Sequence, residues 1–484
     1  MSENKPIEET IAEEKPVTIS TALAQRIQEE LGQNVYLCYQ CVKCSSGCPL
    51  AEFFDWQPNQ IMRALQLGQE DIALESKTPW LCSACQTCST RCPQELDIAA
   101  IMDFLTREAL KRGKTPPVSE VPLFNEAFMR EVRIWGRAYE PGLMAEIKLR
   151  NPKSMFDDLD LYTRMLRKMK VGFLPSIGRT PRNVKPIAGA SQAVAYYPGC
   201  SLESTATEFN NSSKAVCKAL DIELIEPHGW VCCGSTPAHR SDPAEALRLP
   251  MENLALIEKS GFQEVTMPCA ACFSRHKFAQ HEIRTHEQKR RAMVEALDYN
   301  YKDSVQVNTL IQTIYQRVGK EKLAEKTQKP LKGLRVVCYY GCLLTRPPEV
   351  TEAEHPENPT DMDELLEAMG AEILDWSYKT TCCGAAHALT RPDIILKLSS
   401  NLVNYARQVG ADVIAVACPL CDMNLDTRQF QMEAASLIDG TIPVMYFTQL
   451  MALALGLPEQ EAFLNKNMVD PRPILSQRGI LSTI

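Results

Sequence analysis

The sequence lacks the long apolar runs of a membrane-spanning chain. Its longest candidate, VMYFTQLMALALGL (444–457), is shorter than the roughly 20 residues that cross a bilayer, and it contains Thr448 and Gln449. The first 14 residues hold five glutamates and no apolar core, which is unlike a secretory signal peptide. These absences predict a cytoplasmic protein without a membrane span.

Excess basic charge is also missing. The formal net charge is −8 and the pI is about 5.6, so no nucleic-acid partner is expected. No Gly-x-Gly-x-x-Gly follows a strand pattern, and RGKT (112–115) has Glu108 where the first glycine of a P-loop would stand. We therefore expect no flavin or NAD in this chain, so that flavin chemistry belongs to a partner subunit.

Cysteine, by contrast, is abundant, with 20 in 484 residues. In a chain without an export signal this number favours metal binding or redox chemistry over a disulfide framework. Eighteen cysteines fall into four compact groups. The other two, Cys217 and Cys338, lie in helix-like and strand-like patterns and are expected in the core.

The chain divides into a helical part and a repeated part. The helical part includes DIAAIMDFLTREALKR, whose apolar residues recur near a period of 3.6. From residue 193 onward, strand-like and helix-like patterns alternate, and the order occurs twice with offsets of 142, 150 and 149 residues between corresponding cysteines. The fold class predicted is multidomain, an N-terminal all-α module followed by two duplicated α/β domains with a pseudo-twofold relation. The predicted ranges are 1–20 for a disordered acidic tail, 21–170 for the helical domain, 171–192 for a linker, and 193–330 and 331–484 for the two α/β domains.

The helical module contains two copies of a bacterial 4Fe–4S motif. CYQCVKCSSGCP and CSACQTCSTRCP both fit C-x₂-C-x₂-C-x₃-C-P, in which the fourth cysteine crosses over to the other cluster. Two zinc ribbons are the alternative interpretation. The motif predicts one cubane cluster on Cys38, Cys41, Cys44 and Cys92, and a second on Cys82, Cys85, Cys88 and Cys48.

Each α/β domain contains five cysteines, including a Cys-Cys-Gly sequence. Five thiolates are one more than the four irons of a cubane accept, so adjacent cysteines suggest a distorted cluster with a bridging thiolate. Gly234 and Gly384 would let the backbone approach the cofactor closely. Zinc in one of these sites is a second interpretation. The two quintets are Cys200, Cys232, Cys233, Cys269 and Cys272, and Cys342, Cys382, Cys383, Cys418 and Cys421.

The five-cysteine pattern resembles the CCG domains of the heterodisulfide reductase B subunit, and residues 21–170 resemble its C subunit, as in a fusion of C and B. WGRAYEPGLM (135–144) and PVMYFTQLMALALG (443–456) are also similar to these subunits. The resemblance implies one non-cubane 4Fe–4S cluster per quintet, in addition to the two cubanes. Leu343 and the segment AAHAL (385–389) differ from the family pattern beside the expected substrate pocket.

The resemblance implies an oxidoreductase acting on sulfur groups, as a subunit of a larger complex. Single electrons would pass from the cubanes to the non-cubane clusters, which reduce a small disulfide or oxidise thiols in reverse. A flavoprotein resembling the A subunit, and a hydrogenase, a formate dehydrogenase or another electron-input subunit, are the partners it implies. An alternative is a relay subunit of the glycolate oxidase or anaerobic glycerol-3-phosphate dehydrogenase type, which passes electrons to quinone. A zinc-stabilised binding protein is a third interpretation.

Two histidines follow the Cys-Cys-Gly sequences. His239 and His387 are candidate proton donors to a departing thiolate. The alternative is that each is a hydrogen-bonded residue that supports a cluster without exchanging protons.

Overall fold

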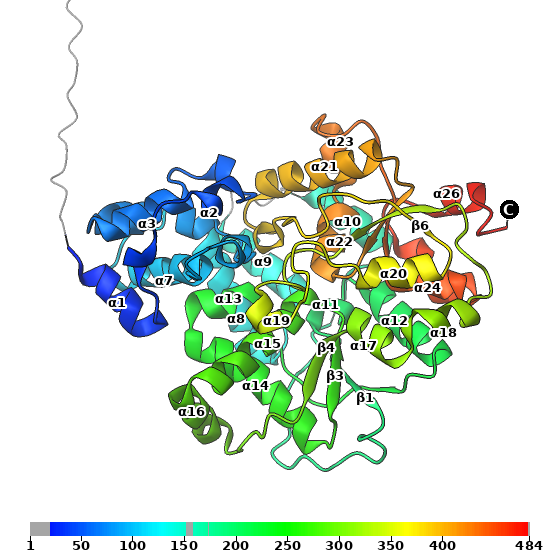
Figure 1. The fold of residues 1–484 in the computed structure, drawn as a ribbon, viewed down its shortest axis with the longest axis horizontal. Helices are drawn as coiled ribbons and strands as arrows, with labels where there is room; N and C mark the ends of the chain where they lie inside the picture. The colour runs from blue at the N-terminus through cyan, green and yellow to red at the C-terminus, as the bar shows by residue number, and fades with distance from the viewer. Residues whose placement is uncertain (1–19, 152–157, 173, 483–484) are drawn as a thin grey trace, which may run out of the picture.

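The computed structural model describes residues 20–151, 158–172 and 174–482. All of the expected acidic tail except Ser20 lies outside these residues. The helices of residues 20–111, drawn in blue, lie to one side of the two α/β units (Figure 1). In the described residues, no helix combines the length and the apolar character that crossing a bilayer requires.

The N-terminal part is built from helices, as predicted. Helix α7 begins where the Asp97 side chain accepts a hydrogen bond from the Ala100 amide, and it buries the apolar face seen in its sequence. The helices are α1 (Ala22–Leu31), α2 (Lys43–Ser46), α3 (Pro58–Gln66), α4 (Glu70–Glu75), α5 (Thr78–Leu81), α6 (Thr87–Thr90), α7 (Ile98–Lys111), α8 (Glu120–Trp135), α9 (Glu140–Arg150) and α10 (Leu159–Arg167).

The first α/β unit, copy one, alternates parallel strands with helices. Asp242 caps α14 by accepting from the Ala244 and Glu245 amides, and Thr309 forms a capping box with Gln312 at α17. Its elements are β1 (Val194–Tyr196), α11 (Cys200–Glu203), α12 (Thr207–Ala219), β2 (Leu224–Ile225), α13 (Ser235–Ser241), α14 (Pro243–Lys259), β3 (Glu264–Met267), α15 (Ala270–Thr285), α16 (Glu287–Leu297), β4 (Gln306–Thr309), α17 (Leu310–Arg317) and α18 (Gly319–Lys326).

Copy two repeats this order. Its strand β7 is buried along its whole length, as a parallel strand covered on both faces should be. Its elements are β5 (Arg335–Tyr339), α19 (Pro348–Thr351), α20 (Asp361–Ala368), β6 (Glu372–Ile373), the 3₁₀ helix η4 (Ala385–His387), α21 (Pro392–Gln408), β7 (Val413–Val416), α22 (Pro419–Leu425), α23 (Gln429–Ala434), β8 (Val444–Tyr446), α24 (Phe447–Ala454), α25 (Glu459–Ala462) and α26 (Arg472–Gln477).

The two sheets have the same topology. Their strand orders are β2-β1-β3-β4 and β6-β5-β7-β8, and all pairs are parallel. In register, Val265 lies opposite Val307 in copy one, and Ile414 lies opposite Val444 in copy two. The predicted duplication is therefore confirmed at the level of sheet topology.

One continuous apolar core joins the two copies. Phe209 on α12 stacks on Tyr446 at the end of β8, with ring centroids 4.2 Å apart, and the Ser212 and Thr448 hydroxyls hydrogen-bond at 2.7 Å. The described residues of 171–192 form neither helix nor strand. The domain boundaries themselves stay a prediction.

Candidate cysteine-lined redox site

The cysteines of each quintet lie just beyond the carboxyl ends of the central strands. Cys200 follows β1 and begins α11, while Cys269 follows β3 and precedes α15. In copy two, Cys342 follows β5 and Cys418 precedes α22. Because neighbouring parallel strands end at the same edge, residues far apart in sequence meet there, as they do in other open α/β sheets.

All ten quintet cysteines line a single cavity of about 280 Å³. Within copy one, the Cys233 and Cys272 sulfurs are 3.6 Å apart, and within copy two the Cys383 and Cys421 sulfurs are 3.9 Å apart. The two quintets also meet, since a hydrogen bond from Cys269 lowers the pKa of the Cys418 thiol. The sequence predicted one cysteine quintet in each of two related α/β domains, and in the structure both quintets line the same cavity.

Two glycines that the sequence analysis did not single out pack against these sulfurs. Gly199 and Gly341 each precede the first cysteine of a quintet and have φ of 76° and 72°. A Cβ on Gly199 would lie 2.8 Å from the Cys272 sulfur, and one on Gly341 would lie 2.9 Å from the Cys421 sulfur. Only glycine fits both the backbone and the space. The repeated Gly-Cys at the strand ends was the signal for them.

The predicted cofactor-binding glycines contact sulfur through their backbone. The Gly234 amide donates to the Cys232 sulfur at 3.4 Å, and the Gly384 amide donates to the Cys382 sulfur at 3.3 Å. Their α-carbons, however, face apolar side chains, because a Cβ on Gly384 would meet Leu398 at 3.1 Å. Their approach to a cofactor stays a prediction.

The helical module gathers the two predicted quartets. Cys48, Cys82, Cys85 and Cys88 line one small cavity with apolar neighbours that include Phe54 and Met102. In the other quartet, burial raises the pKa of the Cys44 thiol, with smaller contributions from Cys38 and Cys41, and Cys41 and Cys92 flank Tyr39. Cys48 thus lies with the three close cysteines of the second motif, and Cys92 lies near Tyr39 and Cys41 of the first. Their crossover as cluster ligands stays a prediction.

The second quartet lies against copy two. A hydrogen bond with Cys382, together with burial, raises the pKa of the Cys85 thiol. Arg346, which is 2% exposed, donates to the Thr87 hydroxyl at 2.9 Å and to the Thr380 carbonyl at 2.8 Å. The cysteine groups therefore follow one another in space, from the first quartet to the second, then to the quintet of copy two and the quintet of copy one.

The donor sets fit iron–sulfur clusters. Thiolates are the ligands that such clusters take, and amide and hydroxyl hydrogen bonds to sulfur tune them. Both features occur here: Asn424 Nδ2 donates to the Cys383 sulfur at 3.4 Å, and the Ala138 amide to the Cys200 sulfur at 3.4 Å. No group of three or more His, Cys, Asp or Glu in the described ranges is arranged to hold a lone metal ion. The quintet thiols instead line a cavity, as ligands of a cluster of several iron atoms would.

The two predicted proton donors lie outside the cavity lining. His239 Nδ1 is 2.6 Å from Asp103 Oδ2 on α7, and His387 Nε2 donates to the Leu81 carbonyl at 2.8 Å. Burial lowers the pKa of His239, and it lowers that of His387 to about 3, so both rings are neutral near pH 7. Both histidines hold the helical module against the copies. Their catalytic role stays a prediction.

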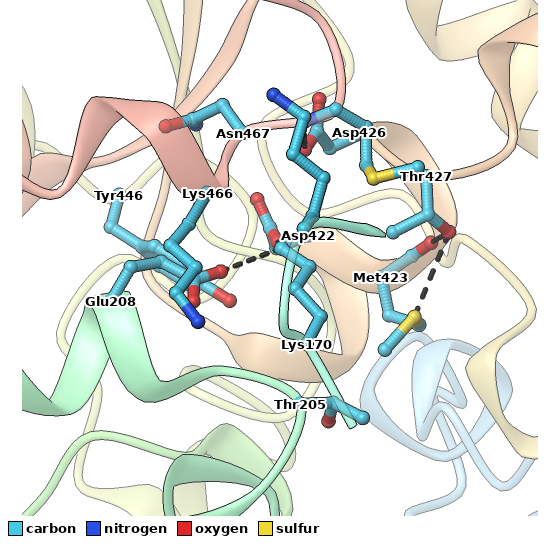
Figure 2. Close-up of polar contacts among 12 residues, drawn as sticks. Lys170, Thr205, Glu208, Asp422, Met423, Asp426, Thr427, Tyr446, Lys466 and Asn467 are labelled. Carbon is cyan, nitrogen blue, oxygen red and sulfur yellow. Dashed lines mark hydrogen bonds and ion pairs between the residues drawn. The ribbon is translucent and has the colours of Figure 1, made fainter. Parts of the chain in front are cut away.

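A buried group of charges lies where the three parts of the chain meet (Figure 2). The Lys170 ammonium, which is 1% exposed, lies 2.6 Å from Glu208 Oε1 on α12 and 3.5 Å from Asp422 Oδ2 on α22. Burial raises the pKa of Asp422 to about 8 and that of the nearby Asp426 to about 6. Burial opposes the Lys170 charge, but these acids outweigh it and raise the pKa of Lys170.

The rest of the cavity wall is largely apolar. It includes Phe124, Phe128, Met144 and Leu161 from α8, α9 and α10. In the described part of the chain, only three charged residues line it: Glu140, Asp158 and Arg428, the last two of which form an ion pair at 3.1 Å. The sequence analysis identified none of the three.

Comparison with known families defines the class of protein. A 4Fe–4S dicluster domain matches residues 37–97, and a cysteine-rich domain, CCG, matches residues 194–275 and again 336–426. These ranges contain every cysteine of the two quartets and the two quintets. The chain is thus an iron–sulfur protein that joins a dicluster ferredoxin module to two CCG domains.

Relatives of the α/β part specify the family. The chain is 32% identical to the 8-methylmenaquinol:fumarate reductase membrane anchor subunit of Wolinella succinogenes, over 57% of this chain and 96% of that protein. It is 30% identical to a protein of Archaeoglobus profundus that is named as similar to the heterodisulfide reductase B subunit, over 54% of this chain and 91% of that protein. The chain belongs to the heterodisulfide reductase-like iron–sulfur family.

The helical part has relatives of its own. It is 34% identical to an A. profundus protein that is named as similar to the heterodisulfide reductase C subunit, over 20% of this chain and about half (52%) of that protein. These matches agree with a fusion of C and B. A crystal structure of a hypothetical protein from Helicobacter pylori covers 68% of this chain, and this chain covers 60% of that one, with a TM-score of 0.50 and 11% identity. That likeness concerns the fold alone.

Proposed function

We propose that this chain belongs to an oxidoreductase complex and carries the site that reduces a small disulfide, or oxidises two thiols in the reverse direction. The observation that carries the proposal is that both quintets line one cavity. Four 4Fe–4S clusters, two on the quartets and two on the quintets, would supply single-electron transfer when bound. Each sulfur atom of a ligand with two sulfurs would then lie at a different quintet.

The surface around the first quartet suits a protein that delivers electrons. Tyr36, Leu37, Tyr39, Val42 and Trp56 are all exposed, at 41% to 59%. The first four lie within seven residues around Cys38 and Cys41, and Trp56 follows Cys48 in the chain. Large exposed apolar side chains gathered near a redox site favour an interface. We propose a flavoprotein of the A-subunit type as the partner there, with a hydrogenase or a formate dehydrogenase as further members of the complex.

Quinone chemistry is the second candidate function. The W. succinogenes relative is named for a methylmenaquinol, and the largely apolar wall of the cavity would also accept a ring of that kind. In this alternative the chain relays electrons between a flavoprotein and a quinone, and no sulfur compound reacts in the cavity.

Iron analysis and electron paramagnetic resonance test the proposal. Anaerobically purified protein should contain about sixteen irons per chain, because four clusters need four each. The double variant Cys382→Ser/Cys383→Ser leaves three thiols in its quintet and should contain about twelve, whereas Cys217→Ser, at a buried cysteine outside the groups, should keep the wild-type count. Thiol added under oxidising conditions should generate a new paramagnetic signal in wild type. If a quinone perturbs the spectrum and no thiol does, the second candidate replaces the first.

A further inference from the structure

Of the two carboxyl groups in the wall of the shared cavity, Glu140 has no ion-pair partner among the residues that the structure describes. It is the first residue of α9 and lines the cavity together with both quintets. Its Oε1 accepts a hydrogen bond from the Thr205 hydroxyl at 3.1 Å, and Thr205 also lines the cavity. Its Oε2 is buried and has no hydrogen-bond partner.

The segment that carries Glu140 lies against the first quintet. Two residues earlier, the Ala138 amide donates to the Cys200 sulfur at 3.4 Å. Thr205 follows Cys200 on the connection between α11 and α12, where the Ser204 hydroxyl donates to the Cys200 carbonyl at 3.4 Å. The hydrogen bond between Glu140 and Thr205 thus joins the helical module to copy one at the edge of the space where a substrate sulfur would lie.

The charged groups on the packed elements leave Glu140 without a neutralising cation. Among the described residues, no ion pair includes it. Arginines and lysines nearby are bound to other acids: Arg130 and Arg150 to Glu146, Arg137 to Glu203, Arg428 to Asp158, and Lys170 to Glu208. Glu131 on α8 is a second buried acid facing α9, close to Gly142, and it likewise has an unpartnered oxygen.

Burial in this apolar wall raises the pKa of Glu140 to about 7, and the neighbouring Ser204 and Thr205 hydroxyls oppose the rise. The positive end of α9 also favours the carboxylate. The group is therefore present in both protonation states near neutral pH. A carboxyl with such a pKa passes its proton to a thiolate of pKa about 8.5 with an equilibrium constant of roughly thirty.

We propose that Glu140 exchanges protons with the sulfur substrate in this cavity, an inference that rests on the proposed function. Reduction of a disulfide breaks one S–S bond, takes up two electrons and two protons, and forms two S–H bonds. The electrons come from the reduced electron-transfer partner. The acid form of Glu140 gives its proton to a departing sulfur, and the carboxylate is protonated again from solvent before the next transfer. Unlike His239 and His387, this side chain reaches the cavity.

The variant Glu140→Gln tests the proposal, because it keeps the size of the side chain and the oxygen that accepts from Thr205. With a viologen as electron donor and bis(2-hydroxyethyl) disulfide as substrate, wild type should lose activity as pH rises through about 7. E140Q should be slower by about 10²- to 10⁴-fold and should lose that dependence on pH. Glu140→Asp keeps an acid and should recover part of the rate. The control Glu131→Gln removes a buried acid outside the cavity lining and should keep the wild-type profile.

An infrared pH titration gives a readout that does not depend on turnover. Wild type should show a protonated carboxyl band that disappears near pH 7 and is absent from E140Q. Iron content equal to wild type shows that the variant is folded and loaded. Unchanged rate and pH profile in E140Q overturn the role of Glu140, while the proposed function stands because wild type is active. If wild type reduces no disulfide and oxidises no thiol, the proposed function itself fails, and the role of Glu140 in sulfur chemistry fails with it.

Discussion

The two CCG copies share one frame but connect differently to the helical module. Both use a Gly-Cys at the first strand, and in both a tyrosine holds the loop before the adjacent cysteines: Tyr197 donates to the Val231 carbonyl at 2.7 Å, and Tyr339 to the Thr381 carbonyl at 2.6 Å. After the glycine, however, copy one continues into α13, while copy two has only the short η4. The two copies therefore keep the same arrangement of cysteines, while the segments that follow the Cys-Cys-Gly sequences differ.

The contacts with the helical module differ accordingly. Copy one meets α7 at Asp103, which forms an ion pair with Arg240 and a hydrogen bond with the neutral His239 ring. Copy two meets the second quartet itself, through Arg346 and through Cys382 beside Cys85. Both quintets line one cavity, yet within the described residues only the quintet of copy two has a cysteine hydrogen-bonded to a cysteine of the second quartet, Cys382 to Cys85.

Removing the cation shared by both copies should have the largest effect. Lys170→Met leaves the buried Glu208 carboxylate without its ion-pair partner and removes the ammonium group that faces Asp422. We expect the free energy of unfolding to fall by about 3–5 kcal/mol, measured by urea denaturation of the anaerobic protein. Lys168→Met is the matched control, because Lys168 donates to the Asn465 carbonyl at the surface. Equal stability of the two variants would show that the buried group does not hold the copies together.

Breaking the attachment of copy one should have an intermediate effect. His239 and Arg240 outweigh burial and hold the pKa of Asp103 at about 2. Asp103→Asn keeps the shape but removes the charge beside Arg240, which is 3% exposed. We expect a loss of about 2–3 kcal/mol in the same denaturation experiment. The control Asp71→Asn breaks an exposed ion pair with Lys114 and should change the free energy of unfolding by less than about 1 kcal/mol. A similar loss in both variants would contradict this account.

The smallest effect is on the pH dependence of stability, and it comes from His387 of copy two. The folded pKa of His387 is about 3, and its unfolded pKa is about 6.5. Below about pH 6.5 the unfolded state binds a proton that the folded state does not, so this contribution to stability is present at higher pH and is lost as pH falls. Between about pH 7.5 and pH 5.5, His387→Gln should lose about 1.4 kcal/mol less stability than wild type. The exposed His228→Gln should follow wild type, and an identical pH slope in His387→Gln would refute the buried neutral histidine.

The cysteine groups could be predicted because their chemistry is encoded locally. Spacings of two and three residues, adjacent cysteines and a strand before each site define the quartets and quintets, and the repeat predicts a duplicated sheet. The structure confirms that fold class and brings the members of each group together. Gly199 and Gly341 were visible in the same repeat but were overlooked, because their role depends on sulfurs more than 70 residues away.

Other site residues could not be read from the sequence. Glu140 lies in the segment WGRAYEPGLM that resembles the family, but the resemblance assigns it no role, and Lys170 belongs to no motif. A single charge in a helical pattern is usually solvated. Each reaches its buried contacts only where α9 or the chain after α10 packs against copy one. The histidines show the converse: their position after Cys-Cys-Gly suggested the cavity, but tertiary packing turns both rings toward the helical module. One cavity shared by both quintets likewise arises only from the packing of the copies.

The position of Lys170 has a consequence for how such a protein is put together. This lysine precedes both CCG copies in the chain. Its ammonium group nevertheless contacts Glu208 of copy one and Asp422 of copy two. A fragment that began at the first strand would bury Glu208, Asp422 and Asp426 at the interface between the two copies without the Lys170 ammonium group. In this protein one continuous chain supplies that lysine together with both copies in a ratio of one to one, so the segment before the first CCG domain also takes part in holding the two copies together.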